Sequence, residues 1–186
     1  MKEVEIKLPF ASAPEARLRL ERLDVREVTR RSFEDNRLFD RADGSLQAAE
    51  EVLRLRSAGG RSILTYKAPV AGEHRYKVRE EHETRLDDPQ ALVRILERLG
   101  FSQAFRYQKY RTEFARGDLE ITLDETVLGC FVELEGAPAD IDRMAHELGF
   151  SPDEYVRDSY LELHEREARR RGIPPGDLLL ATDEPQ

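Results

Sequence analysis

The chain has 186 residues, which is enough for one domain with a buried core and short for two. Hydrophobic residues make up 39% of the chain and charged residues 37%, a balance typical of a soluble and unusually ionic folded protein. The net charge of -8 argues against general binding to nucleic acid, but it still allows a local cationic pocket, because charges beyond roughly 10 Å are screened by salt.

Membrane spans and disulfides are also excluded by the sequence. No stretch approaches the roughly 20 apolar residues of a spanning helix, and the first residues lack a signal pattern, so we expect a cytoplasmic protein. The single cysteine, Cys130, cannot form an internal disulfide. We expect it to be a small buried hydrophobe rather than a nucleophile.

The first half of the chain is predicted to be mostly strand. Residues 2–8 alternate between charged and apolar side chains, which indicates a strand with one face of each kind. Ser12 with Glu15 is a capping box and predicts the start of a helix. Ala58-Gly59-Gly60 joins two alternating segments, which is typical of a tight hairpin. Strands are expected here at residues 2–8, 25–39, 52–56, 62–67 and 74–85.

The second half adds helices and the remaining strands. Proline at the start and glycine at the end predict helices over residues 89–99 and 138–148. A longer helix is expected over residues 153–171, with three arginines suited to its negative C-terminal end. We expect one domain at 1–172 and, because periodicity is lost, a flexible tail at 173–186. The remaining strands are expected at 106–115, 119–124 and 130–135.

Each predicted strand has one apolar face and one charged face. The apolar positions are Val4, Ile6, Leu8, Leu53, Leu55, Leu119, Ile121, Leu123, Val132 and Leu134. The opposite positions are almost all charged: Glu3, Glu5, Lys7, Arg54, Arg56, Lys67, Arg79, Glu81, Glu83, Lys109, Arg111, Glu120, Asp124, Glu133 and Glu135. Helices must cover the apolar face, so the charged face points inward if the sheet closes. We therefore predict an α+β fold, a closed antiparallel eight-stranded barrel with a charged lumen and helices outside.

A lumen with charges of both signs suits a metal-bound polyphosphate. Arginine and lysine donate to phosphate oxygens, and clustered carboxylates suit Mg²⁺ or Mn²⁺. The alternative is a solvated face held by cross-strand salt bridges. Charges repeated on at least six strands, with like-charged neighbours that repel one another, favour a ligand.

The charged positions also resemble a known family. Glu3-Val4-Glu5-Ile6-Lys7 is similar to the E-x-E-x-K signature of the CYTH superfamily, the triphosphate tunnel metalloenzymes. Segment 158–163 resembles the end of the class IV adenylyl cyclase branch, within a bacterial group that also includes proteins like thiamine triphosphatase. The resemblance covers about residues 1 to 165, and its other motifs follow in the family's order at residues 53–56, 64–67, 79–83, 109–111, 123–124 and 133–135.

The resemblance implies a role for most of the charged residues. The residues implied to bind divalent metal are Glu3, Glu5, Asp124, Glu133 and Glu135. Those implied to bind the triphosphate are Lys7, Arg54, Arg56, Lys67, Arg79, Lys109 and Arg111. Within that second set, we expect catalytic roles for Lys7, Arg54, Lys67 and Arg111. Glu81 and Glu83 match a pair that faces the tunnel, with an open role, and the match over residues 35–40 is loose.

The implied function is metal-dependent chemistry on a triphosphate. A class IV-like adenylate cyclase, converting ATP to cyclic AMP and pyrophosphate, leads by whole-chain resemblance. A hydrolase of inorganic or thiamine triphosphate is the alternative, and a non-catalytic polyphosphate- or nucleotide-binding module is the second. The expected partner is a small-molecule triphosphate (ATP, tripolyphosphate or thiamine triphosphate), with no nucleic-acid polymer and no membrane, and the chain is expected to form a homodimer. Tyr107 and Tyr110 are assigned to packing rather than to base stacking.

Overall fold

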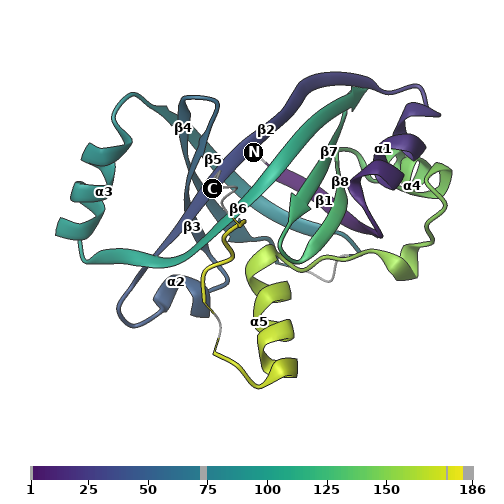
Figure 1. The fold of residues 1–186 in the computed structure, drawn as a ribbon. Coiled ribbons are helices and arrows are strands. Elements are labelled where there is room, and N and C mark those ends of the chain that lie inside the picture. Colours follow the sequence, from purple (N-terminus) through teal and green to yellow (C-terminus); the bar gives the residue numbers. More distant parts are fainter. Residues whose placement is uncertain (1, 72–74, 175, 182–186) are drawn as a thin grey trace, which may run out of the picture.

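A computed structural model describes residues 2–71, 75–174 and 176–181. Within them, eight antiparallel strands close into a barrel in the order β1-β5-β4-β3-β2-β6-β7-β8, which confirms the predicted fold (Figure 1). The strands are β1 (Lys2–Phe10), β2 (Arg26–Arg41), β3 (Val52–Ala58), β4 (Arg61–Pro69), β5 (Lys77–Leu86), β6 (Phe101–Arg116), β7 (Leu119–Thr126) and β8 (Gly129–Glu135). The helices are α1 (Ala13–Glu21), α2 (Ser45–Ala48), α3 (Pro89–Arg98), α4 (Pro138–Glu147) and α5 (Tyr160–Arg171).

Most predicted elements have local causes that the structure confirms. The Ser12 hydroxyl accepts a hydrogen bond from the Glu15 amide at 3.3 Å and caps α1. Gly59 and Gly60 both have positive φ, as the turn between β3 and β4 requires. The short helix α2 was not predicted, and residue 74, where we expected β5 to begin, lies outside the described residues.

The prediction of one helix over residues 153–171 was wrong. Pro152–Glu154 forms a single 3₁₀ turn, and the chain then extends so that Val156 and Lys7 exchange two backbone hydrogen bonds of 2.9 Å. A new helix starts after Ser159, whose side chain accepts from the Glu162 amide in a capping box. Pairing with the barrel therefore overrides helix propensity before residue 160.

The apolar face of the barrel packs against the helices. On one side, α1 and α4 cover β1, β7 and β8, and on the other side α3 covers a smaller cluster with Phe39 and Leu55 (right and left in Figure 1). The fully buried residues of the larger cluster include Ile6, Leu8, Leu20, Ile121, Val132, Leu134 and Ile141. This packing confirms that the apolar positions face outward, which leaves the alternate, mostly charged positions for the lumen.

The chain beyond α5 returns to the barrel. The Gln108 amide donates to the Leu178 carbonyl, and the Leu178 amide donates to the Arg106 carbonyl, both at 2.9 Å. Leu178 is buried in a cluster with Phe105 and Tyr160. The flexibility expected for residues 173–186 stays a prediction, and residues 175 and 182–186 lie outside the described part. Among the residues that the structure describes, no helix has the length and apolar character needed to cross a membrane.

Substitution of Met144 tests the core between the helices and the outer face of the barrel. Its side chain in α4 is 1% exposed, so Met144→Ala leaves a cavity and is expected to lower the free energy of unfolding by roughly 2–5 kcal/mol. Urea unfolding followed by circular dichroism measures this loss. Leu99→Ala, at a side chain that is 66% exposed, is the control and is expected to change stability by less than about 0.5 kcal/mol. Equal losses in the two variants would contradict this account of the core.

Candidate functional site

The charged face of the barrel encloses a cavity of about 860 Å³. This volume falls within the range of roughly 300–1,000 Å³ that small-molecule sites occupy. Its charged lining includes Glu3, Glu5, Lys7, Arg54, Arg56, Lys67, Lys77, Glu81, Glu83, Lys109, Arg111, Glu133 and Glu135. Most of the side chains that the sequence assigned to metal or phosphate therefore meet in one space.

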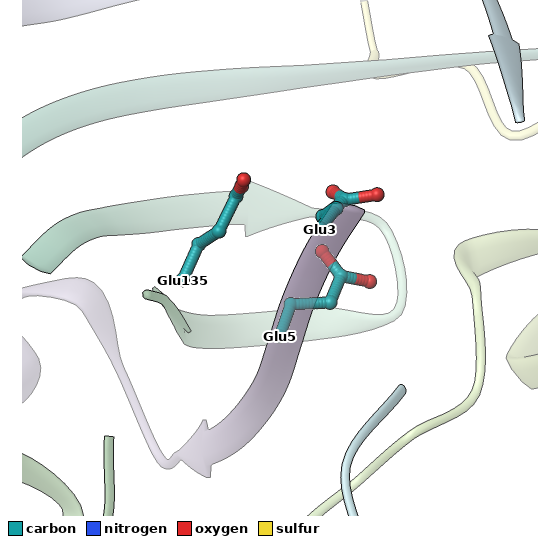
Figure 2. A group of neighbouring side chains, drawn as sticks. All are labelled: Glu3, Glu5 and Glu135. Atoms are coloured by element: carbon teal, nitrogen blue, oxygen red, sulfur yellow. The ribbon is translucent and has the colours of Figure 1, made fainter. Parts of the chain in front are cut away.

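Three carboxylates gather at one place in this lumen. Glu3 and Glu5 lie on β1, and Glu135 on β8 is the register partner of Glu5 (Figure 2). One oxygen of each lies within 4.8 Å of the others, and we call these three residues the carboxylate cluster. Burial, together with the nearby charges of Glu3 and Glu5, raises the pKa of Glu135 to about 8. Three neighbouring carboxylate oxygens, with Glu3 and Glu5 buried and Glu135 partly buried, fit a hard divalent cation such as Mg²⁺ or Mn²⁺.

Lysines partly balance the carboxylate cluster. Glu5 Oε1 lies 3.1 Å from Lys7 Nζ and 3.0 Å from Lys77 Nζ, and Lys67 Nζ lies 2.7 Å from Glu3 Oε1. Burial alone would raise the pKa of Glu5, but Lys7 and Lys77 outweigh it and lower the pKa below its usual value. The pKa of Lys77 is itself lowered, because its burial outweighs the attraction of Glu5. Lys77 was not among the predicted site residues, although it shares the alternating face of Arg79 and Glu81.

The two other predicted metal ligands occupy different ion pairs. Asp124 is fully buried and accepts hydrogen bonds from Lys109, Arg111 and the Tyr160 hydroxyl at 2.6–2.8 Å. Glu133 pairs with Arg111 and, at 3.2 Å, with Lys7. Among the described residues, neither belongs to the carboxylate cluster. Their binding of metal stays a prediction and requires that they give up these cations.

The pair whose role was left open, Glu81 and Glu83, lies on β5, the strand next to β1. The Thr65 hydroxyl donates to Glu83 at 2.6 Å, and Glu83 lies 3.5 Å from Arg54 and 3.8 Å from Arg56. Glu81 lies 3.2 Å from Lys67, and its burial raises its pKa to about 7 against the opposing charge of that lysine. Both glutamates therefore lie beside predicted phosphate ligands.

Arg79 is the predicted phosphate ligand that the structure places elsewhere. Its guanidinium donates to the backbone carbonyl of Glu50 at 2.6 Å, and the residue does not line the cavity. Its role in phosphate binding stays a prediction and requires that the side chain turn toward the lumen.

Helix α5 begins against the lumen. The Tyr160 hydroxyl donates to Asp124 at 2.8 Å, and the Tyr160 ring centroid lies 5.5 Å from Lys7 Nζ and 5.2 Å from Lys109 Nζ. Burial and the nearby Asp124 raise the pKa of this hydroxyl well above its usual value, so it stays protonated and donates. The sequence flagged the segment around Tyr160 but not this contact.

The fold and the lumen define a closed barrel whose interior brings together a carboxylate cluster and several lysine and arginine side chains. The profile of the CYTH domain family matches residues 1–166, and the chain therefore belongs to the CYTH family of triphosphate-binding tunnel proteins. Members of this family depend on divalent metal, which agrees with the carboxylate cluster.

Individual relatives agree with the family. A Methanocaldococcus jannaschii protein named a putative adenylate cyclase is 31% identical over 174 residues, covering 88% of this chain and 98% of that protein. A solved structure from Pyrococcus horikoshii has a TM-score of 0.72 at 27% identity, covering 89% of this chain and 99% of that chain. A Hippeastrum protein has a TM-score of 0.57 at 20% identity, covering 93% and 96%. It is described as a putative adenylyl cyclase with a dominant triphosphatase activity.

Glu5→Gln tests the carboxylate cluster as a metal site. The substitution removes one charged donor but keeps the volume, so we expect the affinity for Mn²⁺ to fall at least about tenfold while the barrel stays folded. Calorimetric titration with Mn²⁺ measures the affinity, and circular dichroism checks the fold. Glu80→Gln is the matched control, because Glu80 lies on the outer face of β5 with its side chain 60% exposed. Wild-type Mn²⁺ affinity in Glu5→Gln would contradict the assignment.

Labelling of Cys130 tests whether its thiol is unreactive in the folded protein. It is buried in the cluster beneath α1 and α4, and burial, with Glu125 and Asp124 nearby, raises its pKa to about 11. Because the thiolate is the reactive form, we expect little reaction with an aromatic disulfide reagent at pH 8 until urea unfolds the chain. Rapid labelling of the folded protein, followed by absorbance, would show that the thiol is accessible instead.

Proposed function

We propose that the chain is a divalent-metal-dependent enzyme that cleaves triphosphates in its lumen. Its leading form is an adenylate cyclase of the class IV kind, which converts ATP to cyclic AMP and pyrophosphate. The observation that carries the enzyme proposal is the carboxylate cluster facing the same cavity as the lumen cations. Binding a polyphosphate needs only the cations, whereas three clustered carboxylates beside them would repel it unless a metal lay between.

The lumen side chains would hold and orient the substrate. Lys7, Arg54, Arg56, Lys67, Lys109 and Arg111 donate hydrogen bonds or supply positive charge to the phosphate oxygens. Glu3, Glu5 and Glu135 would hold Mg²⁺ or Mn²⁺, which neutralises phosphate charge and lowers the pKa of an attacking hydroxyl. In the structure Lys7 pairs with Glu5 and Glu133, and Lys109 pairs with Asp124. Substrate binding would therefore exchange these carboxylate partners for phosphate oxygens.

Cyclisation and hydrolysis differ in the nucleophile. In the cyclase, the 3′ hydroxyl of ATP attacks the α-phosphorus, the bond to the bridging oxygen of the β-phosphate breaks, and pyrophosphate leaves as the hydroxyl proton passes to water. Positioning and charge stabilisation supply most of the rate in such transfers. Arginines in the lumen would stabilise the charge that develops on the leaving pyrophosphate.

The relatives favour one form each. The name of the Methanocaldococcus jannaschii protein, at 31% identity, supports the cyclase. The Hippeastrum protein, described with a dominant triphosphatase activity, supports the alternative, in which water attacks a terminal phosphorus and releases orthophosphate. A module that binds nucleotide or polyphosphate without turnover is the third candidate.

We also propose that residues 1–172 form the tunnel domain, and that the protein works as a cytoplasmic homodimer.

A product assay separates these candidates. Purified protein is incubated with Mg²⁺ or Mn²⁺ and, separately, with ATP, tripolyphosphate or thiamine triphosphate, and the phosphates and cyclic AMP are quantified. We expect cyclic AMP and pyrophosphate in equal amounts from ATP. Glu5→Gln is expected to lose at least about a hundredfold in kcat/KM, because it weakens the metal that stabilises the transition state, whereas Glu80→Gln keeps wild-type rates.

Each other result selects another candidate. Orthophosphate without cyclic AMP establishes the triphosphatase. No turnover, with a triphosphate that still raises the melting temperature in the presence of metal, establishes the binding module and overturns the enzyme proposal.

A further inference from the structure

One corner of the lumen is apolar and aromatic. Leu38, Tyr107, Tyr160 and Leu161 line the cavity there, although most of the other lining residues are charged. The ring centroids of Tyr107 and Tyr160 lie 5.7 Å apart, so the two tyrosines form a continuous aromatic wall. A triphosphate gains nothing from such a wall, whereas a flat organic group does.

Asn36 lies beside this wall with its amide unpartnered. The residue is 0% exposed, and neither its Nδ2 nor its Oδ1 has a hydrogen-bond partner. It is two residues after Glu34 on β2, in an unshifted part of the pairing with β6, and Glu34 reaches Lys109 in the lumen at 3.6 Å. Asn36 therefore has the same inward direction as Glu34, and its register partner on β6 is Tyr107. A buried amide without partners is costly, and such groups usually mark a site that a ligand completes.

One more buried atom close to Asn36 is also unpartnered. It is Nε of Arg54, which faces Leu38 across the β2–β3 pairing. Oε2 of Glu34 also has no hydrogen bond, but it forms an ion pair with Lys109. The corner thus offers two unpartnered donors, from Asn36 and Arg54, and one unpartnered acceptor, the Asn36 Oδ1. Ionised phosphate oxygens only accept hydrogen bonds and could satisfy only the donors. A ligand that also donates is required to satisfy the Asn36 Oδ1.

We propose that this corner recognises a nitrogen heterocycle attached to the triphosphate, with Asn36 as the residue that determines substrate specificity. The ring stacks on Tyr107, and an amino group beside a ring nitrogen pairs with the Asn36 amide, as asparagine pairs with adenine elsewhere. Adenine and an aminopyrimidine both carry such an edge, whereas tripolyphosphate carries none. Because the amide is covered when the lumen is empty, the heterocycle must displace neighbouring side chains to reach it. The inference rests on the proposed function and narrows its substrate class to heterocyclic triphosphates.

Asn36→Leu tests the inference, because leucine keeps the volume of the side chain and removes the amide. Binding of ATP and of tripolyphosphate is measured by calorimetry with Ca²⁺ in place of Mg²⁺, and product analysis verifies that the ligands stay intact. We expect the affinity for ATP to fall about tenfold and that for tripolyphosphate to change less than about twofold. The ligand-free melting temperature should not fall, since an unsatisfied buried amide is lost.

Gln108→Leu is the matched control. Its amide lies on the outer face of β6 and donates to Asp35 at 3.3 Å, so its loss should leave the ratio of the two affinities unchanged. If Asn36→Leu leaves the ratio of the two affinities unchanged, whether both fall equally or neither falls, the inference is overturned and Asn36 has no role in specificity. If the wild-type protein binds neither ligand, the proposed function fails, and the inference that rests on it fails too; binding of both with an unchanged ratio overturns the inference alone.

Discussion

Compensation of charge inside a closed barrel is the constraint on which this structure depends. Side chains alternate along each strand, so closing the sheet with helices outside forces every second residue into the lumen. Buried charges are stable only when paired, and Lys109 shows the result, since it is 2% exposed and lies 2.7 Å from the fully buried Asp124. The lumen is therefore a network in which most charges have a partner across a strand pairing.

Such a network makes ligand binding an exchange of partners. A triphosphate and its cation bring both signs of charge, so they can replace the internal pairs without leaving either sign uncompensated. The carboxylate cluster is the place where internal compensation is least complete, as the raised pKa of Glu135 indicates. A cation held there, as the proposed function requires, would relieve a repulsion that the fold itself creates.

Alternation along single strands was sufficient to predict the barrel, its outward core and most of the lumen. It could not predict which side chains meet across strands, because register depends on the closure of the whole sheet. The isolation of Asp124 from the carboxylate cluster was not foreseen for this reason, whereas Lys77 lies on the alternating face of Arg79 and Glu81 and could have been predicted. The helix expected over residues 153–171 failed for a related reason, since the pairing of Val156 with Lys7 is a long-range contact. Asn36 carries no signal in the sequence, because only its burial without partners marks it.

The segment after α5 has a consequence for aggregation. On the side of β6 away from β2, β7 pairs only with residues 109–116, so the earlier part of this long strand has an edge that β7 does not cover. The two hydrogen bonds of Leu178 cover that edge at Arg106 and Gln108. Open strand edges recruit strands from other molecules, and proteins commonly protect them with a covering segment. A chain shortened at residue 172 would lose this cover and expose Phe105 beside an open edge, which favours edge-to-edge association of the barrels.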